Sequence, residues 1–428
     1  MFLRKSLFVL SVFMLLNVAT TFSLDKIRCS TADIFKRNAT NEPDVVYRKQ
    51  QLESDIQQWL TQNPRNRQNG IEAIITIPVV IHVVYNTNEQ NISDNQIQSQ
   101  IDRLNKDFRN LNTDKLLSSH PFYSFAGDAG IEFCIAKIDP AGNATTGITR
   151  TPTSEVEFDG NPSSTGDEFI KFTNKGGKNN WDPTKYLNLW VCKLNGGTLG
   201  YAQFPSDLAS DPGTDGVVID YRSFGTNGTV EAPYDFGRTA SHEIGHWLNL
   251  EHIWGDENNC SGSDKVDDTP NQQTETTGCP SGTLTDNCTA TSPGIMYQNY
   301  MDYTDDACMV MFSNGQINRM KAVFNVARIG ILTSNKCSGT TGIITQSRTQ
   351  LKIYPNPVEN YLTIENLPKT RSKFYAVDIY NAIGQKVYSN TISAEDTLRE
   401  MADFKSGTYM MMIYNDEFSA TEKLTVVK

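Results

Sequence analysis

Three histidines and a glutamate lie close together in TASHEIGHWLNLEH, residues 239 to 252. His242 and His246 are four residues apart, so on a helix they share one face and their imidazoles can bind the same metal ion. Glu243 lies one step round the helix from His242, where its carboxylate can reach a water on the metal. This pattern indicates hydrolysis by a metal-activated water, and zinc is the metal that suits neutral imidazole.

His252 is the third expected ligand. A continuous helix would carry it about 240° round the axis from His246, onto another face. The helix must therefore end between them, and Asn249 suits the turn because asparagine tolerates the left-handed backbone. Three protein nitrogens with one open position are typical of a catalytic zinc site. The alternatives are histidines gathered by chance on a surface helix and a zinc ion that only stabilises the fold.

Apolar patterns predict the elements that must position this helix. The β-branched run at 75–85 is typical of a buried strand, and residues 91–111 place apolar side chains on one helical face after a capping box at Ser93 and Gln96. Further strands are predicted at 130–139, 186–194, 200–204 and 215–221, and a closing helix at 313–330. We expect an α/β domain with a twisted mixed sheet and the histidine helix packed on it.

Two other regions differ in composition. From His252 to about Cys308 the chain is rich in Gly, Asp, Asn and Cys, so we expect a loop-rich lower subdomain that needs disulfides or ions to stabilise it. After SGTTG (338–342), short alternating apolar runs over 343–428 predict a small all-β sandwich.

The N-terminus predicts export. Residues 1–23 carry Arg4 and Lys5 before an apolar core, as a signal peptide does, and the Leu7 to Val18 run of the alternative, an uncleaved anchor, is short for a membrane span. Export permits disulfides among the eight cysteines. Residues 24 to about 70 are polar and weakly periodic, which indicates a pro-segment or an extended arm; we set the pro-segment at 24–47 and the catalytic domain at 48–337.

The charge balance argues against one class of partner. Against 38 Lys and Arg the 428 residues hold 49 Asp and Glu, a formal charge of -11, and no long basic run could neutralise phosphates. We therefore expect no nucleic-acid partner, and we expect no membrane span in the mature form.

HEIGHWLNLEH resembles the HExxHxxGxxH helix of the metzincin metalloproteases, with Asn249 at the usual glycine. NYMDY (299–303) is similar to their methionine turn, which implies that Met301 lies beneath the metal and that Tyr303 stabilises the oxyanion. The order of HEIGHWLNLEHIWGD, DKVDDTPNQQ, GCP and NYMDYTDDACMVMFSNGQINRM narrows the resemblance to the pappalysin family, of the ulilysin and mirolysin type, over roughly residues 75–330.

The pappalysin resemblance also implies disulfides and calcium. It implies the pairs Cys260–Cys288 and Cys279–Cys308, where spacing alone leaves three pairings open. It assigns no partner to three cysteines that we expect to be buried thiols: Cys134, Cys192 and Cys337. For a structural calcium ion, Asp264 and Thr269 match the family pattern, and their oxygens suit a hard cation. Gln273 stands where an acid is expected, and a solvated acidic loop is the alternative.

The substrate is expected to be a protein or peptide. GTLGYAQF (197–204) is the candidate edge strand for binding an extended peptide. Related enzymes favour Arg or Lys directly after the scissile bond through an acid at the base of a pocket. Asp305 and Asp306 lie in the corresponding stretch, although Ala307 interrupts the match, so a basic preference is a hypothesis.

Cys29 is the candidate for latency. A thiolate is a good fourth zinc ligand, and a pro-segment cysteine in the open position resembles a metzincin cysteine switch. The alternatives are a spare thiol and a disulfide with Cys337. Activation would require a cut after Cys29, and a cut between Tyr47 and Arg48 would fit self-processing by an enzyme that prefers arginine.

The C-terminal runs YPNPVENYLTI, NAIGQKVY and KLTVVK resemble the sorting domain of bacterial type IX secretion, which implies that the secretion machinery is a partner. A carbohydrate-binding or adhesive β module is the alternative. The sequence thus predicts a secreted zinc endopeptidase in which Glu243 is the general base. The competing hypotheses are a non-enzymatic secreted module with a structural zinc and an amidase or deacetylase.

Overall fold

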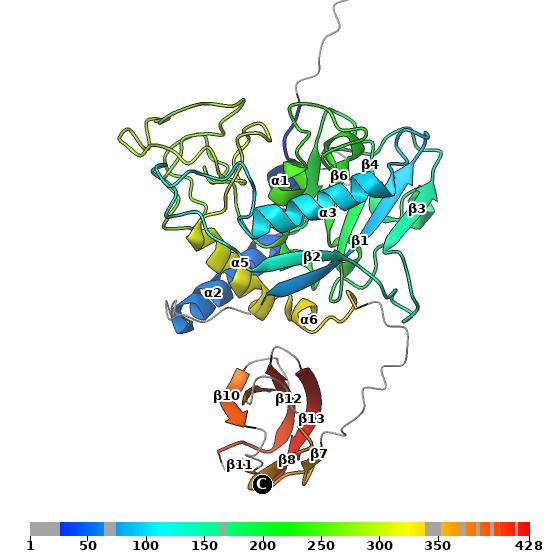
Figure 1. Ribbon diagram of the computed structural model, residues 1–428, viewed down its shortest axis with the longest axis vertical. Helices are drawn as coiled ribbons and strands as arrows, with labels where there is room; N and C mark the ends of the chain where they lie inside the picture. The colour runs from blue at the N-terminus through cyan, green and yellow to red at the C-terminus, as the bar shows by residue number, and fades with distance from the viewer. Residues whose placement is uncertain are drawn as a thin grey trace, which may run out of the picture.

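The computed structural model describes residues 26–63, 74–162, 168–338, 352–367, 374–381, 386–393, 398–401, 403–415 and 418–428. Figure 1 shows an α/β body that carries two N-terminal helices, and a smaller β domain at the C-terminus. The predicted signal peptide lies outside the described residues. Among the described helices, none combines the length and the apolar character that a membrane span requires.

A six-stranded sheet forms the body, in the order β2–β1–β4–β6–β5 with β3 also paired to β1. All pairings are parallel except that of β5, the edge strand, which runs antiparallel to β6. The strands are β1 (Ile75–Tyr85), β2 (Ile131–Ile135), β3 (Ile148–Pro152), β4 (Leu187–Cys192), β5 (Gly200–Ala202) and β6 (Val217–Asp220). Sequence analysis missed only β3, whose five residues are all at least partly exposed and so carry no apolar signal.

Helices pack on this sheet much as the apolar patterns predict. α3 (Asp94–Phe108) begins at Ser93, whose hydroxyl accepts from the Gln96 N–H, and it runs alongside the sheet in Figure 1. α4 (Arg238–Trp247) is the histidine helix, fully buried against β5, β6 and α3. α5 (Asn314–Val326) has the capping box of Ser313 and Gln316, and α6 (Ile329–Leu332) follows it. The described residues of the body also form five 3₁₀ turns: Phe169–Lys171, Thr173–Lys175, Pro205–Asp207, Pro212–Thr214 and Tyr221–Ser223.

The N-terminal segment is helical, so the expectation of an extended arm is wrong. It folds into α1 (Thr31–Asn41) and α2 (Asp44–Gln62). Three apolar side chains of α2, Val45, Leu52 and Ile56, are buried, and α2 lies beside α5 (Figure 1). These residues recur at intervals of seven and four, which is one helical face, but the polar residues between them make the pattern weak.

Turns and loops make up most of residues 253–312, as expected of the lower subdomain. The structure joins Cys260 to Cys288 and Cys279 to Cys308, the pairs that the family resemblance implies. A third disulfide is a correction: Cys134 of β2 is bonded to Cys337, so neither is a free thiol. This bond ties the end of the domain to the sheet across 203 residues of chain, and sequence spacing gives no signal for so distant a pair. Cys192 is a buried free thiol, as expected, and Cys29 is free as well.

The C-terminal domain is an all-β sandwich, as the sequence predicts. Its two sheets have the orders β10–β9–β12–β13 and β11–β8–β7. Its own core, which includes Val358, Leu362, Ile364 and Val377, lies between them. The strands are β7 (Lys352–Tyr354), β8 (Tyr361–Glu365), β9 (Phe374–Tyr380), β10 (Lys386–Ser393), β11 (Leu398–Glu400), β12 (Gly407–Asn415) and β13 (Phe418–Val426).

Candidate metal centre and substrate cleft

The three histidines converge on one point. The Nε2 atom of His242 lies 3.2 Å from those of His246 and His252, and the latter two are 3.0 Å apart. The turn that returns His252 to the cluster passes through Asn249, whose φ of 63° is in the left-handed region that the sequence analysis assigns to it. All three rings are buried.

A hydrogen bond fixes the orientation of each ring. The Nδ1 partners are the Tyr300 carbonyl for His242 (2.7 Å), the Leu250 carbonyl for His246 (2.8 Å) and Asp256 Oδ1 for His252 (2.5 Å). These acceptors place a proton on Nδ1 and leave the Nε2 lone pair free. Burial lowers the pKa of His242, and it lowers the pKa of His246 to about 3, so both are neutral ligands.

The residues fit a zinc ion. Three unprotonated Nε2 atoms that face one another repel unless a cation lies between them. Tetrahedral zinc with Zn–N bonds of 2.0–2.1 Å would separate its nitrogens by about 3.3–3.4 Å, close to the distances found. The Cys29 thiol joins the set, because its Sγ and the three histidine nitrogens all lie within 4.8 Å of one another. Imidazole nitrogen and cysteine thiolate are both zinc ligands, and four such donors complete a tetrahedral site.

Met301 supports the helix from below. Its side chain is fully buried, and its N–H donates to Asn299 Oδ1 (2.9 Å) within the turn. A Cβ atom at Gly245 would lie 2.4 Å from the Met301 sulfur, so the close approach of turn and helix requires glycine there. The methionine side chain therefore packs against α4 at Gly245, next to the ligand His246.

Glu243 lies beside the metal ligands. Its Oε2 accepts hydrogen bonds from the Thr31 hydroxyl (2.9 Å) and the Cys29 thiol (3.4 Å). Among the described residues, its buried Oε1 has no partner. Burial raises the pKa of Glu243 to about 7, which is the range in which a general base is most effective at neutral pH.

Tyr303 approaches the cluster from the methionine turn. Its ring centroid lies 4.8 Å from that of His252, and its hydroxyl donates to the Cys29 carbonyl (3.3 Å). Burial raises the pKa of Tyr303 well above its usual value, so the group stays protonated. It is therefore a hydrogen-bond donor to a peptide carbonyl next to the metal ligands.

The N-terminal segment pairs with the edge of the sheet. Ile27 forms a parallel bridge with Thr198, and Ser30 N–H donates to Gly200 O (3.2 Å). Farther along, the Thr31 hydroxyl accepts from Ala202 N–H (2.9 Å). Residues 27–31 thus take the edge that the sequence analysis assigns to a peptide substrate, and they pass directly over Glu243.

Arg28 reaches a buried acid beside the cluster. One guanidinium nitrogen, Nη2, lies 2.8 Å from Asp306 Oδ1, and the Tyr234 ring centroid lies 4.8 Å from the guanidinium carbon. The other carboxylate oxygen accepts from the N–H groups of Phe236 (3.0 Å) and Arg238 (3.1 Å). Arg238 is the first residue of α4, so the positive end of the helix dipole also stabilises the Asp306 carboxylate.

Asp305 differs from its neighbour. It is half-buried, and in the described part of the chain its carboxylate forms no ion pair with Arg28. Burial raises its pKa. Of the two acids that the sequence offers for a specificity pocket, Asp306 alone therefore binds the arginine.

Asp264 and Thr269 lie together in the loop after α4. The Thr269 hydroxyl is 2.8 Å from Asp264 Oδ2 and 2.9 Å from the Val266 carbonyl. Burial raises the pKa of Asp264 to about 7. A buried carboxylate next to a hydroxyl oxygen is chemically suited to a hard cation, which would keep the carboxylate ionised. Gln273 contributes its backbone N–H to Asp286 (2.7 Å).

Sequence reasoning missed four residues of the site: Arg28, Thr31, Tyr234 and Asp256. Arg28 and Thr31 lie close to Cys29 in the sequence, and this proximity is the only sequence feature that points to them. Asp256 follows His252 by four residues, but no helix links them, so spacing gives no reason to pair them. Tyr234 comes close through the loop before α4, which local sequence patterns do not describe.

Comparisons with known proteins identify two regions. Residues 172–325 match the family model for peptidase M43, described as pregnancy-associated plasma protein-A. Residues 352–427 match the model of the secretion system C-terminal sorting domain.

Solved structures and curated relatives extend the match. Mature mirolysin of Tannerella forsythia, solved with a cleaved peptide, is 52% identical; the match covers 61% of this chain and 97% of that chain, with a TM-score of 0.59. A glutamate-to-alanine variant of promirolysin from the same organism is 47% identical over 71% of this chain and 96% of its own, with a TM-score of 0.64. An extracellular metalloprotease of Coccidioides posadasii is 40% identical over 148 residues, 34% of this chain and only about half (51%) of that relative.

Proposed function

The chain belongs to the pappalysin (peptidase M43) family of metalloproteases, and on that premise we propose that it is an extracellular zinc endopeptidase made as a latent precursor. The observation that carries this proposal is the convergence of three buried Nε2 atoms within 3.2 Å of one another, with Glu243 beside them. A zinc site that only stabilises the fold has no need of a buried carboxylate directly beside its ligands.

His242, His246 and His252 would hold the zinc ion, which would supply a Lewis acid for the peptide carbonyl and make water easier to deprotonate. Glu243 takes the proton from the attacking water and returns it to the leaving amine. The Tyr303 hydroxyl donates to the oxyanion that develops on the carbonyl. β5 binds the substrate backbone by strand addition.

Replacement of Glu243 by alanine tests the role of the base. We expect casein hydrolysis to fall by about a thousandfold, because general-base catalysis is typically worth 10² to 10⁴, while elemental analysis still finds one zinc per chain. Equal activity in Glu243→Ala would refute the assignment. Loss of the zinc together with activity would point to a metal site that only stabilises the fold.

Latency is assigned to Cys29. We propose that its thiolate takes the fourth zinc position in the precursor and that its release opens the site. Burial and the Glu243 carboxylate raise the pKa of the thiol, and a zinc cation would oppose both effects. The hydrogen bond from the Thr31 hydroxyl to Glu243 supports a second effect, since it engages the base as well.

The pro-segment extends through α2 in this proposal. The helix continues without interruption through Tyr47 and Arg48, and Arg48 forms an ion pair with Asp207 (3.2 Å). A first cut between Tyr47 and Arg48 would require that part of α2 to unfold. N-terminal sequencing of the processed chain checks this, and a mature N-terminus at Arg48 would contradict it.

A preference for Arg or Lys after the scissile bond is supported by Arg28, a cation that already pairs with Asp306. We call the space that Arg28 occupies between Asp306 and the Tyr234 ring the Asp306 pocket. The test is cleavage-site profiling of a proteome-derived peptide mixture by wild type and Asp306→Asn. We expect basic residues to be enriched after the cut in wild type, and the enrichment to be lost in the variant. A wild-type profile without basic enrichment would rule the preference out.

Calcium at Asp264 and Thr269 is the remaining cofactor proposal, supported by the raised pKa of the buried carboxylate and the oxygens around it. Addition of Ca²⁺ to the apo chain should raise its Tm, and Asp264→Asn should not respond; an equal response in both would contradict the site.

For export, the type IX machinery is proposed to recognise residues 343–428. Deletion of these residues should retain the protein inside the cell, and unchanged secretion would refute that role.

A further inference from the structure

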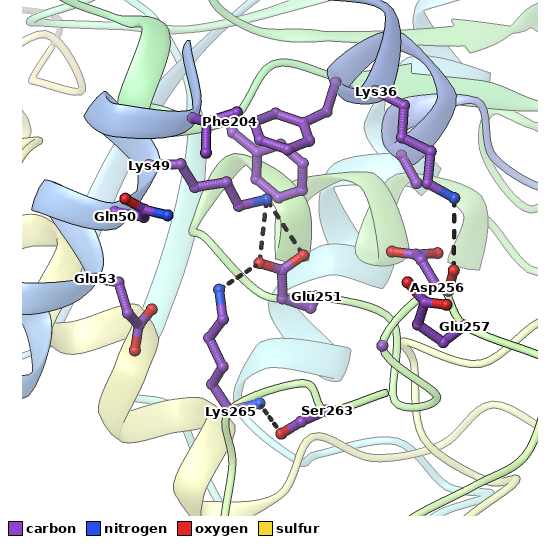
Figure 2. Close-up of a pocket in the computed structure, with 14 residues that line it drawn as sticks. Lys36, Lys49, Gln50, Glu53, Phe204, Glu251, Asp256, Glu257, Ser263 and Lys265 are labelled. Carbon is purple, nitrogen blue, oxygen red and sulfur yellow. Dashed lines mark hydrogen bonds and ion pairs between the residues drawn. The ribbon is translucent and has the colours of Figure 1, made fainter. Parts of the chain in front are cut away.

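A second cation of the pro-segment fills a recess of the catalytic domain. Figure 2 shows Lys49 of α2 directed at Glu251, with the ring of Phe204 beside its ammonium group. Lys49 Nζ lies 3.1 Å and 3.2 Å from the two carboxylate oxygens and 3.4 Å from the Phe204 ring centroid. Lys265 also reaches Glu251 (3.2 Å), and a cavity of about 500 Å³ adjoins these residues. We name Phe204, Glu251 and Lys265 the Phe204–Glu251 recess.

The recess adjoins the metal ligands. Glu251 directly precedes His252, and the Phe204 ring centroid lies 5.5 Å from that of His246. Phe204 also follows β5 by two residues, so the recess lies at the C-terminal end of the strand that would bind substrate.

The Asp306 pocket, which Arg28 fills, lies at the opposite end of the same edge. Arg28 follows Ile27, which pairs with Thr198, whereas Glu243 faces the middle of the edge near Gly200. From the N-terminal to the C-terminal end of β5, the order is therefore the Asp306 pocket, the catalytic residues and then Phe204. The two cation-binding recesses flank the reacting centre, and a peptide along β5 would reach both.

The recess keeps its chemistry when the pro-segment leaves. Phe204, Glu251 and Lys265 all belong to the catalytic domain, whereas Lys49 and the Phe35 ring, whose centroid lies 4.1 Å from Lys49 Nζ, depart with α1 and α2. Five further residues that line the cavity leave with these helices and open it to solvent: Ala32, Lys36, Val46, Gln50 and Glu53. Lys265 compensates part of the Glu251 charge, but the position over the Phe204 ring is left open. A carboxylate beside an aromatic face binds ammonium and guanidinium groups well when it is partly shielded from water.

We propose that the Phe204–Glu251 recess is a substrate subsite of the processed enzyme that binds a Lys or Arg side chain on the acyl side of the scissile bond. The proposal rests on the proposed function, which assigns the Asp306 pocket to the residue after the bond. The pro-segment then blocks two subsites with two cations, Arg28 and Lys49. The substrate class is peptides that carry basic residues on both sides of the cut.

The test uses enzyme processed from the full chain and peptides that keep Arg after the bond. Each acyl-side position carries Lys, Arg, Gln or norleucine in turn. We expect kcat/KM to be about tenfold higher for Lys than for Gln at one acyl-side position, as a cation–π contact and a partly shielded ion pair together provide. In Glu251→Gln the ratio should fall below about twofold, and Phe204→Leu, which removes only the aromatic face, should lower it as well.

Glu257→Gln is the matched control, because Glu257 lines the same cavity (Figure 2) and forms no ion pair with Lys49 in the described part of the chain. It should keep the wild-type ratio. The proposal is overturned if wild type shows no acyl-side basic preference, or if the preference survives in Glu251→Gln. If either result is found while the enzyme still prefers Arg after the bond, only the subsite proposal fails and the proposed function stands. Absence of any metal-dependent hydrolysis would reject the proposed function itself.

Discussion

At the residue scale, the metal centre depends on α4 and on the turn at Asn249, which together bring three imidazoles to one point. His242, His246 and His252 lie within eleven positions, and helix geometry alone relates the first two. Asn249 carried the local signal for the turn, and its φ of 63° agrees with it. Arg28 and Asp306 are 278 residues apart, and nothing local to either one indicates that they meet. Contacts of that kind need the three-dimensional structure.

Cys29 carries the latency prediction. In Cys29→Ala we expect the uncleaved precursor to hydrolyse a small peptide at least about tenfold faster than the wild-type precursor, because a zinc–thiolate bond is lost. The activity of purified, intact precursor measures this directly. Cys192→Ala is the control, since Cys192 is also a buried free thiol but is not part of the metal cluster. A Cys29→Ala precursor as inactive as wild type would mean that other contacts of the pro-segment suffice for latency.

At the scale of elements, a strong apolar periodicity predicted helices and strands correctly, whereas a weak one did not reveal them. α3 and β1 follow their apolar patterns to within a few residues, because one face of α3 and nearly all of β1 are buried in the core. α2 is 19 residues long, yet it shows only a few separated apolar positions, since its opposite face is solvated and it docks through charges as well. β3 gives no apolar signal either, because it is only five residues long and all of its residues are at least partly exposed.

The docking of α2 gives a prediction for activation. Glu53 accepts two hydrogen bonds from Arg319 of α5, at 2.9 Å and 2.7 Å. Glu53→Gln removes the charge of this pair, so we expect self-activation of the precursor to be about two- to fivefold faster, as the value of a partly exposed ion pair implies. The half-time of precursor processing on a gel measures it. Asp55→Asn is the control, because Asp55 bonds to Gln51 of its own helix.

The same pair predicts the direction of a pH effect. Burial alone would raise the pKa of Glu53, but the hydrogen bonds and charge of Arg319 lower it overall. A carboxyl whose folded pKa is below its unfolded value stabilises docking above the unfolded pKa, and that stabilisation is lost as pH falls through the folded pKa. The difference in Tm between the wild-type and Glu53→Gln precursors should therefore shrink on acidification below about pH 4.5. A constant difference down to pH 3 would contradict this origin.

At the scale of the whole molecule, the chain divides by function. The α/β body with its two N-terminal helices holds all the residues of the candidate metal site and cleft, while the C-terminal sandwich has a separate hydrophobic core. Composition predicted this division because the change after residue 338 is abrupt. The Cys134–Cys337 bond, which closes the body just before that change, had no such signal, since the sequence offers no means of pairing cysteines so far apart.

The central claim is that three imidazoles hold one catalytic zinc ion. Elemental analysis of the purified, processed enzyme, combined with its peptidase activity before and after removal of metal by a chelator, tests this most directly. We expect one zinc per chain, loss of activity in proportion to the zinc removed, and recovery when one equivalent is returned. Full activity in enzyme that contains no zinc would contradict the account.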